Sequence, residues 1–194
     1  MAETIVKSVK SILVYGSDNP SNWRMTPLHN SRFPVQAELL RIWGLSLQGG
    51  LDTSTLLHKD TTYSVVYVLK HKDPVHGLEA PAELAVLEKD GILISKRQIN
   101  LNAGSPDLIR LDNEDWLGVE AGRFRPSCIN GDYITFRLVG RSPTWKSGLV
   151  FAGVEIRPVH PQKWLTSPSE NGFSGAHGVQ LSPPPNEMCY GDGI

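Results

Sequence analysis

The most informative segment of this chain for its fold is Trp145-Lys146-Ser147-Gly148-Leu149-Val150-Phe151-Ala152-Gly153-Val154-Glu155-Ile156-Arg157-Pro158. In an extended chain one face of residues 148–156 carries Val150, Ala152, Val154 and Ile156, and the other carries Leu149, Phe151 and Gly153. Because both faces are mostly apolar, the pattern predicts a central strand of a sheet, which Pro158 ends because it has no N–H. Trp145 and Lys146 precede the strand at a loop mouth and form a candidate site, although Trp145 fits the rim of a core equally well.

Further strands are predicted at 11–15, 35–48, 61–71, 83–88, 92–101, 116–121 and 132–139. In 35–48 an inward series that only Arg41 interrupts places Trp43 in the core, and Gly49-Gly50 is expected to end this strand. Lys89-Asp90-Gly91 is typical of a hairpin turn, and residues 52–57 fit one helical turn.

These elements predict an all-β fold with little helix, an antiparallel two-sheet β-sandwich of jelly-roll type. We expect a lead-in at 1–10, one domain at 11–158, and a tail at 159–194. The tail is rich in Pro, Ser and Gly and buries little apolar surface, so the sequence predicts that it is disordered.

Composition excludes several classes of function. The 194 residues are 40% hydrophobic and 20% charged with a net charge of -1, so direct nucleic-acid binding is not expected. We find neither a signal-peptide core nor an apolar run of about 18 residues, so we expect no membrane span and a cytoplasmic protein, with the nucleus as an alternative. Exposed sheet edges leave a homodimer open.

The sequence offers little support for catalysis or metal binding. Its six histidines are scattered, and it lacks a nucleophile elbow, a phosphate loop and a dinucleotide fingerprint, so no metal, no cofactor and no enzyme activity are expected. Asp112, Glu114 and Asp115 form an acidic cluster, which fits a solvated turn better than glycoside hydrolysis or calcium binding.

Carbohydrate binding has better support, because a sugar ring needs an aromatic plate and a few directed polar groups. Aromatic residues near predicted strand ends are Tyr15, Trp23, Trp116 and Trp145, and the polar residues beside them are Asp18, Asn22, Asn113, Asp115 and Lys146. Trp23 either fills the core from a loop or is exposed for a ligand, and for any one tryptophan core packing is the commoner alternative.

Several blocks in order resemble the phloem protein 2 / Nictaba family of plant lectins. They are 37–43, 51–57, 61–63, the Asp115-Trp116-Leu117-Gly118 segment that continues to Phe124, and the Trp145-Lys146-Ser147-Gly148-Leu149 segment that ends in Ile156-Arg157-Pro158. The resemblance covers about 11–158 and implies a lectin of plant phloem, defence or stress that binds N-acetylglucosamine oligomers or N-glycan cores, with glycans or glycoproteins as partners. The alternative is an interaction or structural phloem protein on the same fold that does not bind sugar.

The family's aromatic–Asp-Asn-Pro–Trp arrangement maps onto Tyr15, Asp18-Asn19-Pro20 and Trp23, with Tyr15 where tryptophan is usual. A carboxylate that the family carries before the Trp-Lys-Ser-Gly block is replaced here by Leu138-Val139-Gly140-Arg141. The predicted carbohydrate-binding residues are Tyr15, Trp23, Asp18, Asn22, Asn113, Trp116, Trp145 and Lys146.

Overall fold

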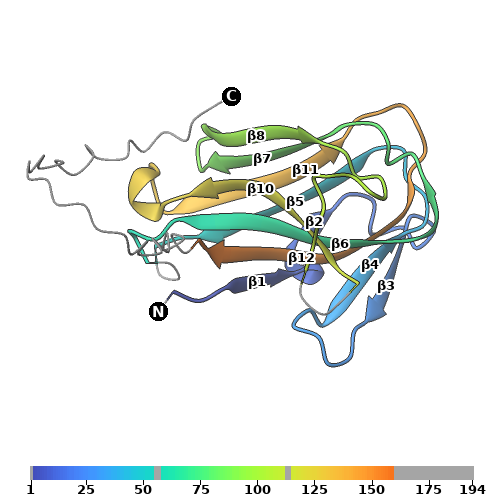
Figure 1. Ribbon diagram of the computed structural model, residues 1–194, viewed down its shortest axis with the longest axis horizontal. Coiled ribbons are helices and arrows are strands. Elements are labelled where there is room, and N and C mark those ends of the chain that lie inside the picture. The colour runs from blue at the N-terminus through green and yellow to red at the C-terminus, as the bar shows by residue number, and fades with distance from the viewer. Residues whose placement is uncertain (1, 55–57, 112–114, 160–194) are drawn as a thin grey trace, which may run out of the picture.

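The computed structural model describes residues 2–54, 58–111 and 115–159, and within them the chain forms two antiparallel sheets packed face to face (Figure 1). The seven-stranded sheet, called sheet A, has the order β3 (Trp23–Pro27), β4 (Val35–Leu39), β12 (Ser147–Pro158), β6 (Tyr63–His76), β10 (Leu117–Phe124) and β9 (Ile109–Arg110), with β1 (Ile5–Ser8) also paired to β12. The five-stranded sheet B has the order β2 (Leu13–Val14), β5 (Leu45–Asp52), β11 (Tyr133–Gly140), β7 (Ala82–Glu88) and β8 (Leu93–Ile99). Two 3-10 turns, η1 (Val9–Ser11) and η2 (Pro126–Cys128), are the only helical elements of the described residues. The predicted sandwich is confirmed, and the chain repeatedly crosses from one sheet to the other, as in a jelly roll.

β12 is central in sheet A, as predicted for residues 148–156, because it pairs with β6, β4 and β1. Its face assignment was wrong beyond residue 152. A β-bulge lies between Phe151 and Gly153, so Phe151, Val154 and Ile156 face the core between the sheets, while Val150 and Ala152 face the opposite side. A bulge inserts one extra residue and therefore reverses the alternation of the rest of the strand.

The predicted strand 35–48 is two strands in different sheets. The chain leaves β4 at Leu39, turns a corner through 40–44 and enters sheet B as β5, and Ile42 in the corner forms an isolated bridge with Lys146. Trp43 lies in this corner and is 50% exposed, so its assignment to the core was wrong. Gly49-Gly50 does not end β5, which continues to Asp52. Both residues are glycines inside the strand because the rings of Phe136 and Tyr133 lie where their Cβ atoms would be.

Three strands were not predicted. β1 lies in residues 5–8, which were expected to be a lead-in, and no strand was expected at 23–27 or 109–110, where the structure has β3 and β9. The short strand predicted at 11–15 is reduced to β2, and the remaining strands agree with their predictions to within a few residues. In the expected helical turn at 52–57, Asp52 belongs to β5, and residues 55–57 lie outside the described part of the chain, as do Asn113 and residues 160–194 of the expected tail.

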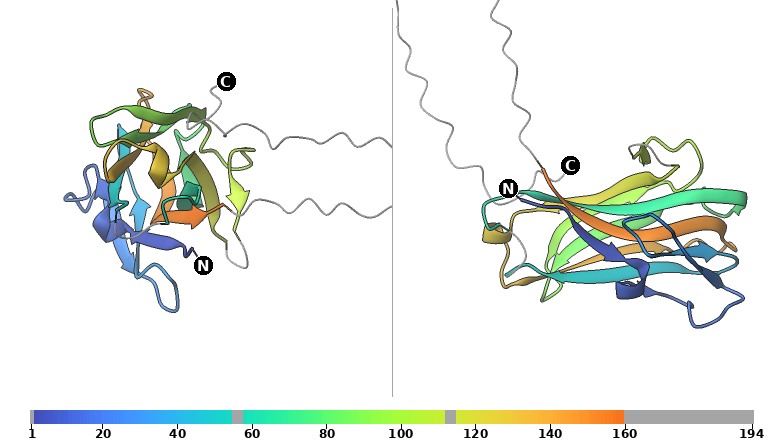
Figure 2. Two further views of the ribbon diagram at one scale, coloured as in Figure 1. Left: turned by 90° about the vertical axis from the view of Figure 1, so that its left-hand side faces the viewer. Right: turned by 90° about the horizontal axis from the view of Figure 1, so that it is seen from below.

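The loops collect at the two ends of the sandwich. We call the end formed by loops 15–22, 40–44, 77–81 and 141–146 the loop end; β6 ends and β12 begins there, on the right of Figure 1. At the opposite end β1 begins and β12 finishes, and Figure 2 shows the two strands side by side. In the described part of the sequence there is no helix with the length and apolarity needed to cross a bilayer.

Candidate functional site

A hollow of about 640 Å³ lies beside Tyr15 at the loop end. The Tyr15 ring is 63% exposed, and its main-chain N–H donates to the Ser46 carbonyl at 3.0 Å, which fixes the residue against β5. The polar residues of the wall are Ser17, Asp18, Asn19, Asn22 and Ser46. The structure therefore brings together three of the predicted site residues, Tyr15, Asp18 and Asn22.

The wall of the hollow is a series of tight turns. The Ser17 N–H donates to Val14 O, Asn19 N–H to Gly16 O, and Asn22 N–H to Asn19 O, at 2.9–3.3 Å. Gly16 has a φ of 73°, which favours glycine, and Asn22 Nδ2 donates to Gly16 O at 3.2 Å. These bonds hold Asp18 and Asn22 in one loop and leave the Asn22 side-chain oxygen as an acceptor.

Trp23 supports this loop from inside. It is 2% exposed as the first residue of β3, and its indole Nε1–H donates to the main-chain oxygen of Tyr15 at 2.9 Å. Of the two alternatives left open by the sequence, the structure shows the core position. Trp23 offers no free ring face to a ligand, and its contribution to a site is to hold Tyr15 in place.

A second exposed aromatic group lies at the same end. The rings of Trp43 and Trp145 are 50% and 48% exposed, with centroids 5.2 Å apart and planes at 81°. The Arg41 guanidinium lies 4.3 Å from the centroid of the Trp145 ring. Trp145 is one of the predicted site residues and Trp43 is not, although the break of the inward series at Arg41 was a signal that the strand ends there.

Lys146 lies beneath this aromatic pair rather than on the rim of a ligand site. It is 3% exposed, and its Nζ donates to the main-chain oxygens of Trp43, Ser142 and Thr144 at 2.9, 2.9 and 3.0 Å. An ammonium has three N–H donors, so all of them are used within the protein. Burial lowers the pKa of Lys146, and the charge of Glu79 acts in the opposite direction.

The structure places Trp116 on a different face. It is buried on the outer side of sheet A, where the Lys70 ammonium lies 4.4 Å from its ring centroid. Beside it is a pocket of about 680 Å³ whose charged or ionisable lining residues are His29, Lys70, Arg110 and Asp115. This pocket is slightly larger than the Tyr15 hollow, but the one tryptophan in its lining, Trp116, is covered and offers no open indole face for stacking.

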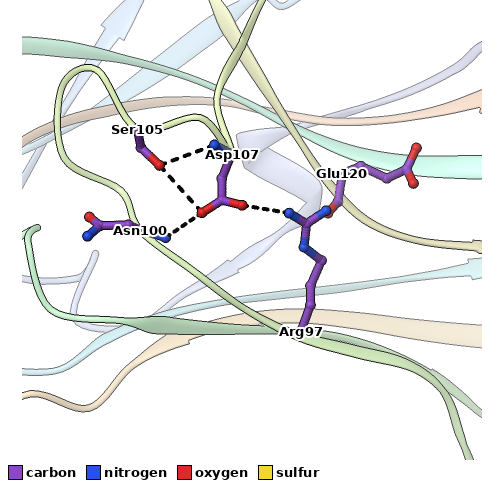
Figure 3. A network of polar contacts seen from close by, with 5 residues as sticks. All are labelled: Arg97, Asn100, Ser105, Asp107 and Glu120. Atoms are coloured by element: carbon purple, nitrogen blue, oxygen red, sulfur yellow. Dashed lines mark hydrogen bonds and ion pairs between the residues drawn. The ribbon is translucent and has the colours of Figure 1, made fainter. Parts of the chain in front are cut away.

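Asp107 fixes the loop that follows β8 (Figure 3). Its carboxylate accepts hydrogen bonds from the Asn100 N–H at 2.9 Å and from Arg97 Nη2 at 2.7 Å, and Arg97 Nη1 also donates to the main-chain oxygen of Glu120. The Asn100 N–H, followed by Arg97 and Ser105, lowers the pKa of Asp107 against the effect of its partial burial. Because the Asn100 side chain also donates to Glu79 O, this network ties the loop to the 77–81 segment of the loop end.

The described residues contain no group of three or more His, Cys, Asp or Glu side chains placed to hold a metal ion. The loop end presents exposed aromatic side chains next to hydrogen-bonding groups.

Comparisons with known proteins agree on one family. The profile of the family described as Phloem protein 2 matches residues 2–158. The chain is 29% identical over 154 residues to the putative F-box protein PP2-B12 of Arabidopsis thaliana, covering 78% of this chain and 59% of that protein. It is 28% identical over 153 residues to the protein PHLOEM PROTEIN 2-LIKE A1 of the same plant, covering 77% of this chain and 59% of that one. The chain spans about half to two thirds of the length of the curated relatives that it matches.

Solved structures with a similar fold include a CBM27-1 module of Caldicellulosiruptor saccharolyticus in complex with mannohexaose, with a TM-score of 0.44 and 13% identity over 83% of this chain and 100% of that chain. A CBM22-1 xylan-binding domain from Paenibacillus barcinonensis has a TM-score of 0.42 and 14% identity over 83% of this chain and 99% of that chain.

Proposed function

Because the chain belongs to the phloem protein 2 family, we propose that it is a carbohydrate-binding lectin whose loop end takes N-acetylglucosamine oligomers or N-glycan cores. Its partners would then be glycans or glycoproteins that carry these sugars, and its role would be binding without catalysis.

The observation that supports this proposal best is the exposed Tyr15 ring at the wall of a polar hollow. The C–H face of a pyranose packs on an aromatic ring, while its rim of hydroxyls needs donors and acceptors that are held in fixed directions. Tyr15 supplies the ring, and Asp18, Asn22 and Ser46 supply the polar groups. The hollow also has the volume of a typical small-ligand site.

The polar wall of the hollow supports a preference for an acetamido sugar over a plain hexose. The acetamido group has one N–H donor and one carbonyl acceptor. A carboxylate such as Asp18 accepts only, and the amide of an asparagine such as Asn19 both donates and accepts. A complementary pair of this kind favours N-acetylglucosamine, because an unmatched polar group in the hollow would lose its hydrogen bond to water without replacement.

One observation favours the alternative, an interaction or structural protein that does not bind sugar. Trp23 is buried, so the hollow has one open ring where the family's motif contains two aromatics. Stacking in the hollow therefore depends on Tyr15 alone.

A calorimetric titration of the protein with chitotriose tests the proposal. We expect micromolar binding that Tyr15→Ala weakens by about tenfold or more, since an aromatic anchor of a binding site contributes more than about 1 kcal/mol. The matched control is Tyr133→Ala, which removes another partly exposed tyrosine ring. Tyr133 is the first residue of β11, at the end of the strand away from the loop end, so this change should leave the affinity unchanged. Absence of binding at millimolar sugar would support the alternative, and cleavage of chitin oligomers that depends on Asp115 would contradict a purely binding role.

A further inference from the structure

We propose that Trp43, Trp145 and Arg41 form a second ring-binding subsite, which takes the neighbouring ring of an oligosaccharide whose first ring occupies the Tyr15 hollow. This inference rests on the proposed function, because the two subsites share one ligand.

The aromatic pair has a shape that suits a sugar ring. Two tryptophan rings that meet at 81°, with centroids 5.2 Å apart, form a corner with two apolar walls. Half of each side chain is open to water. Burying this exposed aromatic surface under a ligand would remove it from water, which favours binding.

Hydrogen bonds join the two loops that form the corner. The Lys146 ammonium joins the carbonyl of Trp43 to those of Ser142 and Thr144, so a single buried charge fixes both loops that carry the rings. The main chains of Ile42 and Lys146 also exchange two hydrogen bonds, of 3.0 and 2.8 Å. Because the main chain that carries the rings is already fixed, less conformational entropy is lost when a ligand binds, which increases the affinity.

Arg41 has hydrogen-bond donors available for a ligand. Six other arginines each form an ion pair with a carboxylate: Arg24, Arg32, Arg97, Arg123, Arg137 and Arg157. No ion pair of Arg41 is found among residues 2–54, 58–111 and 115–159; its guanidinium stacks on Trp145 instead. A guanidinium that is stacked in this way keeps its in-plane N–H donors free, so it can donate to a sugar hydroxyl or to the carbonyl of an acetamido group.

The two subsites are neighbours at the loop end. The main-chain oxygen of Asn22, a residue of the hollow, accepts hydrogen bonds from Leu40 N–H at 2.8 Å and Arg41 N–H at 3.3 Å. Ser46 lines the hollow three residues after Trp43, so their α-carbons are at most about 11 Å apart. A short oligosaccharide can span this distance, and the two subsites therefore fit neighbouring parts of one ligand.

The test is a length series of N-acetylglucosamine oligomers from one to four rings, titrated calorimetrically into the full chain. For the natural protein the affinity should rise about tenfold between one and three rings. In Trp43→Ala this rise should fall to about twofold, while binding of the monosaccharide stays unchanged. Arg41→Ala should weaken trisaccharide binding by about three- to tenfold, and Tyr133→Ala, at the other end, should behave as the natural protein.

The result that overturns the subsite is a length dependence that persists in both Trp43→Ala and Arg41→Ala while Tyr15→Ala abolishes binding. In that case the proposed function stands and only the second subsite fails. If the natural protein binds no sugar of any length, the proposed function fails and the subsite with it. Circular dichroism of each variant verifies that a loss of affinity is not a loss of fold.

Discussion

Replacing Lys146 by methionine is the sharpest test of how the loop end is held together. Methionine has a similar length and is apolar, so it fills the space but donates no hydrogen bond. The change removes three bonds of 2.9–3.0 Å from an ammonium to the carbonyls of Trp43, Ser142 and Thr144. These carbonyls belong to two separate loops, which are then joined mainly by the main-chain bridge at Ile42.

The expected loss follows from two opposing effects. A hydrogen bond to a charged group contributes a net 1.5–3 kcal/mol, so three such bonds together contribute about 4–9 kcal/mol. Burying the ammonium costs several kcal/mol, which the methionine variant recovers; the lowered pKa of Lys146 has this cause. We therefore expect the free energy of unfolding to fall by about 2–4 kcal/mol, and the melting temperature by roughly 5–15 °C for a domain of this size.

Urea unfolding followed by tryptophan fluorescence and circular dichroism measures this loss. The matched control is Lys72→Met, because the Lys72 side chain is 53% exposed and forms an ion pair with Glu38 at 2.8 Å. A surface pair of this kind contributes at most about 1 kcal/mol. A Lys146→Met variant that is no less stable than Lys72→Met would refute the reasoning that the buried ammonium fixes the two loops.

Three further predictions concern positions around the loop end. Gly77→Ala should lower the free energy of unfolding by more than about 2 kcal/mol, because Gly77 has a φ of 67° and a Cβ there would overlap the main-chain oxygen of Trp145. The control Gly104→Ala, at a φ of 83° with nothing within 4 Å of the Cβ, should lower it by only about 1–2 kcal/mol. Equal urea midpoints of the two variants would contradict this prediction. Asp107→Asn should destabilise by about 1–2 kcal/mol at neutral pH. Since the folded pKa of this carboxyl is lowered, its stabilisation is present above the unfolded pKa of 3.8 and is lost as the pH falls through the folded pKa, so the thermal melts of the two proteins should converge as the pH falls below 3.8; a constant difference would count against it. Trp23→Phe should cost about 1 kcal/mol by removing the 2.9 Å bond to Tyr15 O and should weaken sugar binding about three- to fivefold, whereas an unchanged affinity would show that Tyr15 does not depend on this bond.

Much of the fold could be predicted, because a strand with one face in the core has apolar and polar residues in alternation along its sequence. β6, β7, β8, β10 and β11 follow from this pattern. Alternation does not report where a strand turns a corner or inserts an extra residue. For this reason the break at 40–44 and the bulge at Gly153 were missed, and with them the exposure of Trp43 and the face of Val154.

The candidate site was predicted in part. The motif around Tyr15 locates the hollow, since turn formers such as Asn19-Pro20 lie between two aromatics. The roles of individual residues depend on contacts between segments that are far apart in the chain. Lys146 meets Trp43 across 103 positions, and Trp23 reaches Tyr15 through its indole, so sequence alone could not show that both are supports rather than ligand contacts.

The most direct test of the central claim is an NMR titration of the ¹⁵N-labelled protein with chitotriose. We predict that the chemical-shift changes concentrate in residues 15–22, 40–46 and 142–146, and that the pocket beside Lys70 and Trp116 on the outer face of sheet A stays unchanged. Shift changes confined to that outer pocket, or no change at millimolar sugar, would contradict the claim that the loop end binds carbohydrate.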